Sequence, residues 1–144
     1  MKYEILKDEF IEFDGRKLYR IKALKDFHNV KKGKVGGYIA SERNLSHEGD
    51  AWVYGNAQVS GNAQVLNRHS VVWFSNVGTE NGTLTVYCGK NGLIATRGCL
   101  TGSVEEFLDK SAKVHDEKTK REYELLIEVA RSRLEEAQGN IGSE

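Results

Sequence analysis

Hydrophobic and polar residues alternate along the first part of the chain, as in β-strands that bury one face. The alternation predicts strands near residues 2–6, 9–13 and 16–23. An Asp-Gly pair at 14–15 separates the last two, and this pair between alternating segments is a strong signal for a β-hairpin. Residues 1–34 are therefore expected to form an N-terminal hairpin and a polar loop.

Around residues 50–66 the spacing at which hydrophobic residues recur changes from two to six residues. Two Gly-Asn pairs, at 55–56 and 61–62, suit tight corners because both residue types tolerate positive φ. Self-similarity at a fixed short period predicts a β-solenoid. The recurring small and aliphatic residues are Ala51, Ala57 and Ala63, with Val53, Val59, Val65, Val71 and Val77.

The run Ala-Trp-Val-Tyr-Gly-Asn-Ala-Gln-Val-Ser-Gly-Asn-Ala-Gln-Val at 51–65 resembles the hexapeptide-repeat proteins. This resemblance implies a left-handed β-helix of about two coils over residues 35–78. Together with Val-Gly-Thr-Glu-Asn-Gly-Thr-Leu-Thr-Val-Tyr and Arg-Gly-Cys-Leu-Thr-Gly-Ser-Val-Glu-Glu-Phe, the chain also resembles a group of small phage and prophage proteins. Two coils leave both ends of a solenoid open, so the flanking segments are expected to cap them.

Alternation returns in the last part of the chain. Residues 83–87 and 93–97 flank an Asn-Gly pair at 91–92, which predicts a second hairpin. If residue 88 pairs with residue 93, Leu84, Val86 and Cys88 share one face with Leu93, Ala95 and Arg97, and the threonines line the other.

Two helices are expected to follow this hairpin. Ser103 with Glu106, and Thr119 with Glu122, have the spacing of capping boxes, and each precedes apolar residues at helical spacing.

The expected fold is thus mainly β with C-terminal helices, namely a short left-handed β-helix with a cap at each end. The expected segments form one compact domain: an N-terminal β-hairpin cap at 1–34, the repeats at 35–78, a ββαα segment at 79–138 and a frayed tail at 139–144.

Composition narrows the class of protein. Lys plus Arg and Asp plus Glu each number 21 in 144 residues, so the net charge is zero, which argues against a general nucleic-acid binder. Two cysteines without CxxC spacing indicate reduced thiols, and no signal segment or membrane span is evident. A cytoplasmic protein is expected, in the bacterial host if the chain is phage-encoded.

The polar side chains of the second hairpin suggest a ligand site. Amide, hydroxyl and guanidinium groups near a helix start suit a phosphate, and a neighbouring aromatic ring can stack on a base. The alternative is that Arg97 pairs with Glu80 or Glu105 and that the aromatic ring belongs to the core. The candidate ligand residues are Arg97, Thr83, Thr85, Thr96, Asn81, Trp73 and Phe74.

Trp52 and Tyr54 alternate with inward-facing residues, so they are expected to point outward and to form the interface of a homodimer or homotrimer. Many hexapeptide-repeat proteins are acyltransferases with a histidine base, for which His69 is the candidate. Cys99 follows an arginine and a glycine, and we interpret it as a core thiol.

Three hypotheses for function remain. The first is a non-catalytic phage-encoded protein that binds a phosphorylated small molecule, for example to sequester a nucleotide-type immune signal of the host as an anti-defence device. The second is a structural or protein-interaction oligomer module, and the third is the remnant of an acyltransferase. We expect no cofactor, metal, DNA or membrane partner.

Overall fold

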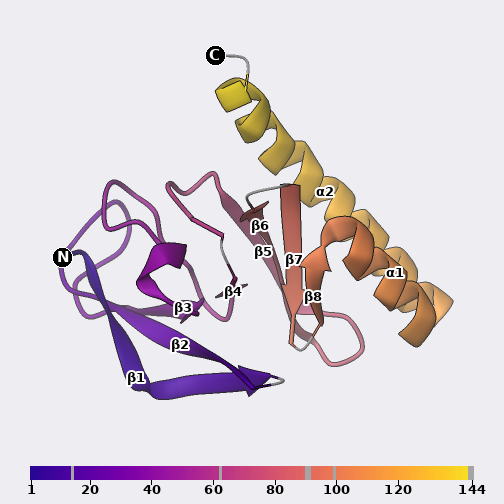
Figure 1. The fold of residues 1–144 in the computed structure, drawn as a ribbon, viewed down its shortest axis with the longest axis horizontal. Coiled ribbons are helices and arrows are strands. Elements are labelled where there is room, and N and C mark those ends of the chain that lie inside the picture. The colour runs from indigo at the N-terminus through magenta and orange to yellow at the C-terminus, as the bar shows by residue number, and fades with distance from the viewer. Residues whose placement is uncertain (14, 62, 90–91, 99, 143–144) are drawn as a thin grey trace. The chain divides into compact units, whose positions relative to one another are not determined.

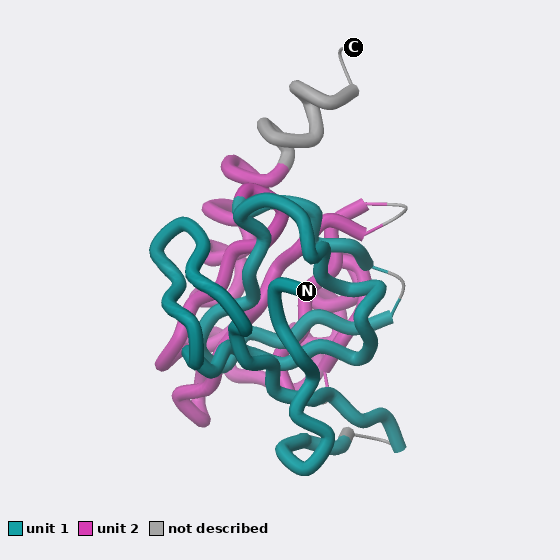
Figure 2. Tube along the Cα trace, turned by 90° about the vertical axis from the view of Figure 1, so that its left-hand side faces the viewer, with its two compact units in different colours: residues 1–68 teal, residues 69–144 magenta. Residues whose placement is uncertain are grey.

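The structure is a computed structural model that describes residues 1–13, 15–61, 63–89, 92–98 and 100–142. It divides into two compact units, residues 1–68 and residues 69–144 (Figure 2). The chain is mainly β with two C-terminal helices, as the sequence predicts (Figure 1). Each unit contains one four-stranded sheet.

The first unit contains the sheet β1-β2-β3-β4. Strands β1 (Tyr3–Phe13) and β2 (Arg16–Ala23) form the predicted N-terminal hairpin, in which Phe13 pairs with Arg16. The separate strands predicted at 2–6 and 9–13 are one strand, β1, whose register shifts between Leu6 and Phe10. Strand β3 (Val35–Ile39) pairs antiparallel with β2 and parallel with β4 (Gln58–Val59). Asp14 of the predicted turn lies outside the described residues.

The predicted left-handed β-helix is wrong. Within the repeats from 50 to 66, β4 is the only strand among the described residues, and no closed solenoid forms. The backbone of the repeats instead bonds to the segment that begins at β3, because the N–H groups of Gly37, Tyr38 and Ala40 donate to the carbonyls of Val53, Ala57 and Val59. These bonds join the repeats to one neighbouring segment, whereas a closed solenoid needs a paired strand in each repeat.

The six-residue pattern nevertheless predicts burial correctly. Gly55 and Gly61 have φ of 54° and 66°, as expected for corners. Seven of the recurring small and aliphatic side chains are at most 4% exposed: Ala51, Val53, Ala57, Val59, Ala63, Val65 and Val71. The eighth, Val77, is only partly buried.

Asn44 connects the segment that follows β3 to the repeats. It ends the 3₁₀ turn η1 (Glu42–Asn44) and is fully buried. Its Oδ1 accepts hydrogen bonds from the N–H groups of Ala40 and Ser41, both at 3.0 Å. Its Nδ2 donates to the carbonyls of Gly61 at 3.2 Å and Ala63 at 2.8 Å. One amide therefore binds four backbone groups, of which the Ala40 N–H also donates to the Val59 carbonyl at 3.2 Å.

The second unit contains the antiparallel sheet β5-β6-β7-β8. Its strands are β5 (Val71–Val77), β6 (Gly82–Gly89), β7 (Gly92–Arg97) and β8 (Leu100–Ser103). Cys88 pairs with Leu93, so the predicted register of the second hairpin is confirmed.

Two helices cover one face of this sheet (Figure 1). Helix α1 (Val104–Val114) starts with the predicted capping box of Ser103 and Glu106. Helix α2 (Glu117–Gly142) starts two residues before the predicted Thr119 cap, because the Asp116 carboxylate accepts the Thr119 N–H at 2.8 Å. Buried between helices and sheet are Leu84, Val86, Leu93, Ala95, Val104, Phe107, Tyr123, Ile127, Ala130 and Leu134.

Neither helix, over the residues that the structure describes, has the length and apolar character needed to cross a bilayer.

Candidate functional site

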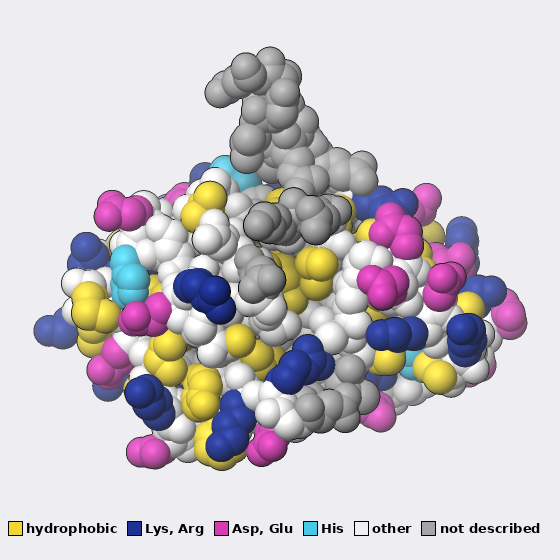
Figure 3. All heavy atoms as spheres, in the orientation of Figure 1, with side chains coloured by type: hydrophobic (Ala, Val, Ile, Leu, Met, Phe, Trp, Pro, Cys, Tyr) yellow, Lys and Arg dark blue, Asp and Glu magenta, His cyan; other side chains and the backbone are white. Residues whose placement is uncertain are grey.

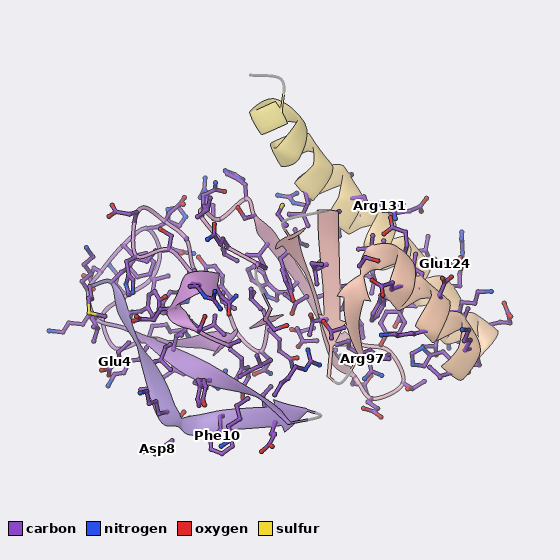
Figure 4. The ribbon with its side chains drawn as sticks, viewed as in Figure 1. Glu4, Asp8, Phe10, Arg97, Glu124 and Arg131 are labelled. Carbon is purple, nitrogen blue, oxygen red and sulfur yellow. The ribbon has the colours of Figure 1, made fainter. Side chains whose placement is uncertain are left out.

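Arg97 lies at the end of β7, on the face of the sheet that the helices cover (labelled in Figure 4). Its side chain is only 12% exposed, and its Nε donates to the Tyr123 hydroxyl at 2.6 Å. A guanidinium nitrogen lies 3.6 Å from Glu80, so the alternative of an ion pair with Glu80 is confirmed. These contacts tie the strand to α2 and to the turn between β5 and β6.

The predicted threonines lie on the opposite face of the same sheet. Thr85 pairs with Thr96 across β6 and β7, and both are buried. The Thr96 hydroxyl lies 2.9 Å from the Tyr87 hydroxyl, and the Thr83 hydroxyl lies 3.2 Å from that of Ser75. Because side chains alternate along a strand, the structure does not bring these threonines together with Arg97.

The other three predicted ligand residues are also separated. Trp73 pairs with Thr85 and shares the threonine face. Phe74 pairs with Leu84 and packs on the core beneath the helices. Asn81 lies in the β5–β6 turn, where its N–H donates to the Gly78 carbonyl at 3.4 Å and its φ is 52°.

The contact of this turn with α2 was not predicted. The Gly78 N–H donates to the Glu122 carboxylate, and a Cβ at position 78 would overlap the Tyr123 hydroxyl. Tyr123 itself is fully buried beneath Phe107 and His115. The glycine is the one sequence signal for this close approach, and it does not name its partner.

The expectation that Trp52 points outward is wrong. Trp52 is fully buried, with ring centroids 5.3 Å from Phe27 and 6.4 Å from Tyr3. Residues 51–53 are all buried, because they form a loop without the alternation of a strand. Tyr54 is half-buried, its hydroxyl donates to Asn29 Oδ1 at 2.9 Å, and burial raises its pKa.

A polar cluster near the N-terminus was also not predicted. The His47 ring stacks on Tyr3 with centroids 4.0 Å apart, Nδ1 accepts the Lys2 N–H at 3.2 Å, and Nε2 lies 3.5 Å from Glu42. The Lys2 ammonium donates to the Ala51 and Glu48 carbonyls, and burial lowers its pKa. Lys2 is only 1% exposed, so its ammonium stabilises the fold and is closed to a substrate, whereas the side chains of His47 and Glu42 are partly exposed.

The remaining candidates for chemistry are His69 and the two cysteines. His69 opens the second unit, just before β5, and has a contact of its own. Cys99 lies outside the described residues, and burial raises the pKa of the Cys88 thiol, which lowers its thiolate fraction. Among the residues that the structure describes, no three His, Cys, Asp or Glu side chains group as metal ligands would.

No family model, curated protein or solved structure matches this chain. Together with the absence of a closed solenoid, this result overturns the resemblance to hexapeptide-repeat and phage proteins.

Replacing Arg97 tests its role directly. Arg97→Ala should lower the free energy of unfolding by about 1.5–3 kcal/mol, the range for hydrogen bonds to charged groups. Arg97→Lys should recover only part, because an ammonium cannot reproduce the guanidinium geometry. Urea unfolding followed by circular dichroism measures both. An unchanged free energy of unfolding in the alanine variant would show that these contacts do not hold Arg97, whose guanidinium would then be available to a ligand.

Proposed function

We propose that the protein is a non-catalytic protein-interaction module that self-associates through α2. The observation that carries this proposal is a second apolar stripe on that helix. Leu125 is 44% exposed and Val129 is 48% exposed, one turn apart on the solvent side. The nucleotide hypothesis is less well supported, because it needs the guanidinium that Tyr123 and Glu80 already bind.

Helix geometry separates the two stripes. At about 100° per residue, Leu125 and Val129 lie opposite the core stripe that contains Tyr123, Ile127 and Leu134. Those three side chains are at most 1% exposed. Exposed leucine and valine at a four-residue spacing form a narrow seam of the kind that a second helix can cover.

Charged residues flank this seam on both sides, and one pair of opposite charges comes level across a two-fold axis. The exposed side chains are Arg121, Glu122, Glu128 and Arg133. In an antiparallel pair of α2 helices related by a two-fold axis, Leu125 is level with the partner's Val129, and Glu122 lies within one residue of the level of the partner's Arg133. On the face drawn in Figure 3, both signs of charge are likewise interspersed over α1 and α2, with hydrophobic side chains between them.

Sedimentation tests the proposal. The wild-type protein at micromolar concentration should exceed the monomer mass of 16.2 kDa. Leu125→Lys combined with Val129→Lys should give a folded monomer, because two ammonium groups would be desolvated in the contact. Val114→Lys, at an exposed position of α1, is the matched control and should still associate.

A wild-type mass of 16 kDa at tens of micromolar would overturn the proposal. A double variant that associates like the wild type would overturn the assignment to α2.

A further inference from the structure

The loop after β2 carries a concentration of positive charge. We name five residues the lysine cluster: Lys22, Lys25, Lys31, Lys32 and Lys34. Lys22 is half-buried and the other four are exposed. Within residues 22–34 Asp26 is the single acid, and its Oδ1 accepts the Lys32 N–H at 2.8 Å. Among the described side chains, no ion pair reaches a lysine of the cluster.

The backbone fixes the cluster in place. The Ala23 N–H donates to the Lys34 carbonyl at 2.9 Å, and the Gly33 N–H donates to the Ala23 carbonyl at 2.8 Å. The Lys34 N–H donates to the Lys31 carbonyl at 3.0 Å, which closes a tight turn. Val30 is 3% exposed and anchors the loop in the core. The backbone thus holds Lys31, Lys32 and Lys34 within four residues on one turn, where their like charges repel one another.

Two exposed apolar side chains lie beside the lysines. The Leu24 N–H donates to the Lys2 carbonyl, which places Met1 alongside Lys25, and Met1 is 76% exposed. Val35 pairs with Lys22 and is 42% exposed.

The surrounding carboxylates leave the cluster positive. Glu4 lies across from Lys22 in the β1–β2 register. Glu48 and Asp50 act on the buried Lys2 ammonium, and Asp50 also pairs with Arg68 at 3.4 Å. The five lysines therefore outnumber the carboxylates that face them.

We propose that this end of the first sheet binds the surface of an anionic membrane. Lipid headgroups supply the negative charge, and each lysine near the surface strengthens binding about fivefold. The interfacial region also accepts the apolar side chains of Met1 and Val35, which would gain nothing on a nucleic-acid backbone. An anionic membrane is thus the partner that can bind both the lysines and the two apolar side chains. The zero net charge of the whole chain does not by itself predict this partner.

Co-sedimentation with lipid vesicles tests this proposal on the full chain. Vesicles with about one third phosphatidylserine should bind the protein and purely phosphatidylcholine vesicles should not, and added salt should weaken binding by screening. Replacing Lys31, Lys32 and Lys34 with glutamine should weaken binding about a hundredfold. Their backbone hydrogen bonds remain, so the fold should survive.

The matched control removes the same charge elsewhere. Lys7, Lys113 and Lys118 are exposed on β1, α1 and α2, and their replacement with glutamine should weaken binding less than tenfold. Equal binding to neutral vesicles, or equal loss in both triple variants, would overturn the proposal. So would single-stranded DNA that binds through Lys31, Lys32 and Lys34 at concentrations where anionic vesicles do not.

Discussion

Asn44→Ala should lower the free energy of unfolding of the first unit by about 3–5 kcal/mol, because several buried polar groups lose their partners together. The substitution leaves the Ser41 N–H and the carbonyls of Gly61 and Ala63 without the side-chain amide that binds them, whereas the Ala40 N–H keeps the Val59 carbonyl as an acceptor. Each unsatisfied buried group costs about 1–3 kcal/mol, and water can re-satisfy only some of them.

Urea unfolding followed by Trp52 fluorescence measures this loss. The chain has two tryptophans, so a Trp73→Phe background leaves Trp52, in the core of the first unit, as the single reporter. Asn44→Asp should be at least as damaging, because a carboxylate oxygen would face the Gly61 and Ala63 carbonyls. Asn56→Ala is the control: its Oδ1 accepts one exposed bond from Arg20, so the expected change is below about 1 kcal/mol.

If the free energy of unfolding of Asn44→Ala lies within about 1 kcal/mol of that of the parent protein, the Asn44 amide does not hold the segment after β3 to the repeats.

The first unit shows what a periodic sequence can and cannot predict. The period-six pattern reports which small and aliphatic side chains are buried, as at Val53, Val59 and Val65, and where corners form, as at Gly55 and Gly61. Alternation fails for Trp52, which is buried. Neither pattern reports which backbone groups pair with each other. Here the repeats bond to β3 and to Asn44, whose partners are 17 and 19 residues away. Nothing in the local pattern of residues 41–44 indicates such distant partners.

The second unit shows a different limit. The predicted register places Arg97 with Leu84 and Val86 and is confirmed, as is the Ser103 cap. A pocket that combines Arg97 with Thr83 and Thr96 therefore needs both faces of one sheet. Proximity along the hairpin suggested a shared site, whereas alternation of side chains separates its members.

Cap chemistry was only partly predictable for the helices. Thr119 and Glu122 have capping-box spacing, yet Asp116 caps α2 and Thr119 is buried. Glu122 binds the Gly78 N–H instead. Several residues near a helix start can serve as caps, and tertiary contacts decide which one does.

Gly78→Ala should lower the free energy of unfolding of the second unit by about 2–4 kcal/mol, for two reasons that act together. The φ of Gly78 is 76°, a conformation that is unfavourable for alanine. The added Cβ would also overlap the Tyr123 hydroxyl, which must then shift away from Arg97 Nε. Helical circular dichroism in urea follows the loss, because both helices belong to this unit.

A double-mutant cycle separates the backbone strain at position 78 from the steric overlap with the Tyr123 hydroxyl. Tyr123→Phe removes the hydroxyl and should itself cost about 1.5–3 kcal/mol through the lost Arg97 bond. In the Tyr123→Phe background, Gly78→Ala should cost at least 1 kcal/mol less than in the wild type, because only the backbone strain and a milder ring contact remain. Gly82→Ala is the control: an added Cβ meets nothing within 4 Å, so the expected change is within about 0.5 kcal/mol. Strictly additive costs would show that the Tyr123 hydroxyl does not press on this turn, and the contact between the turn and α2 would then rest on Glu122 alone.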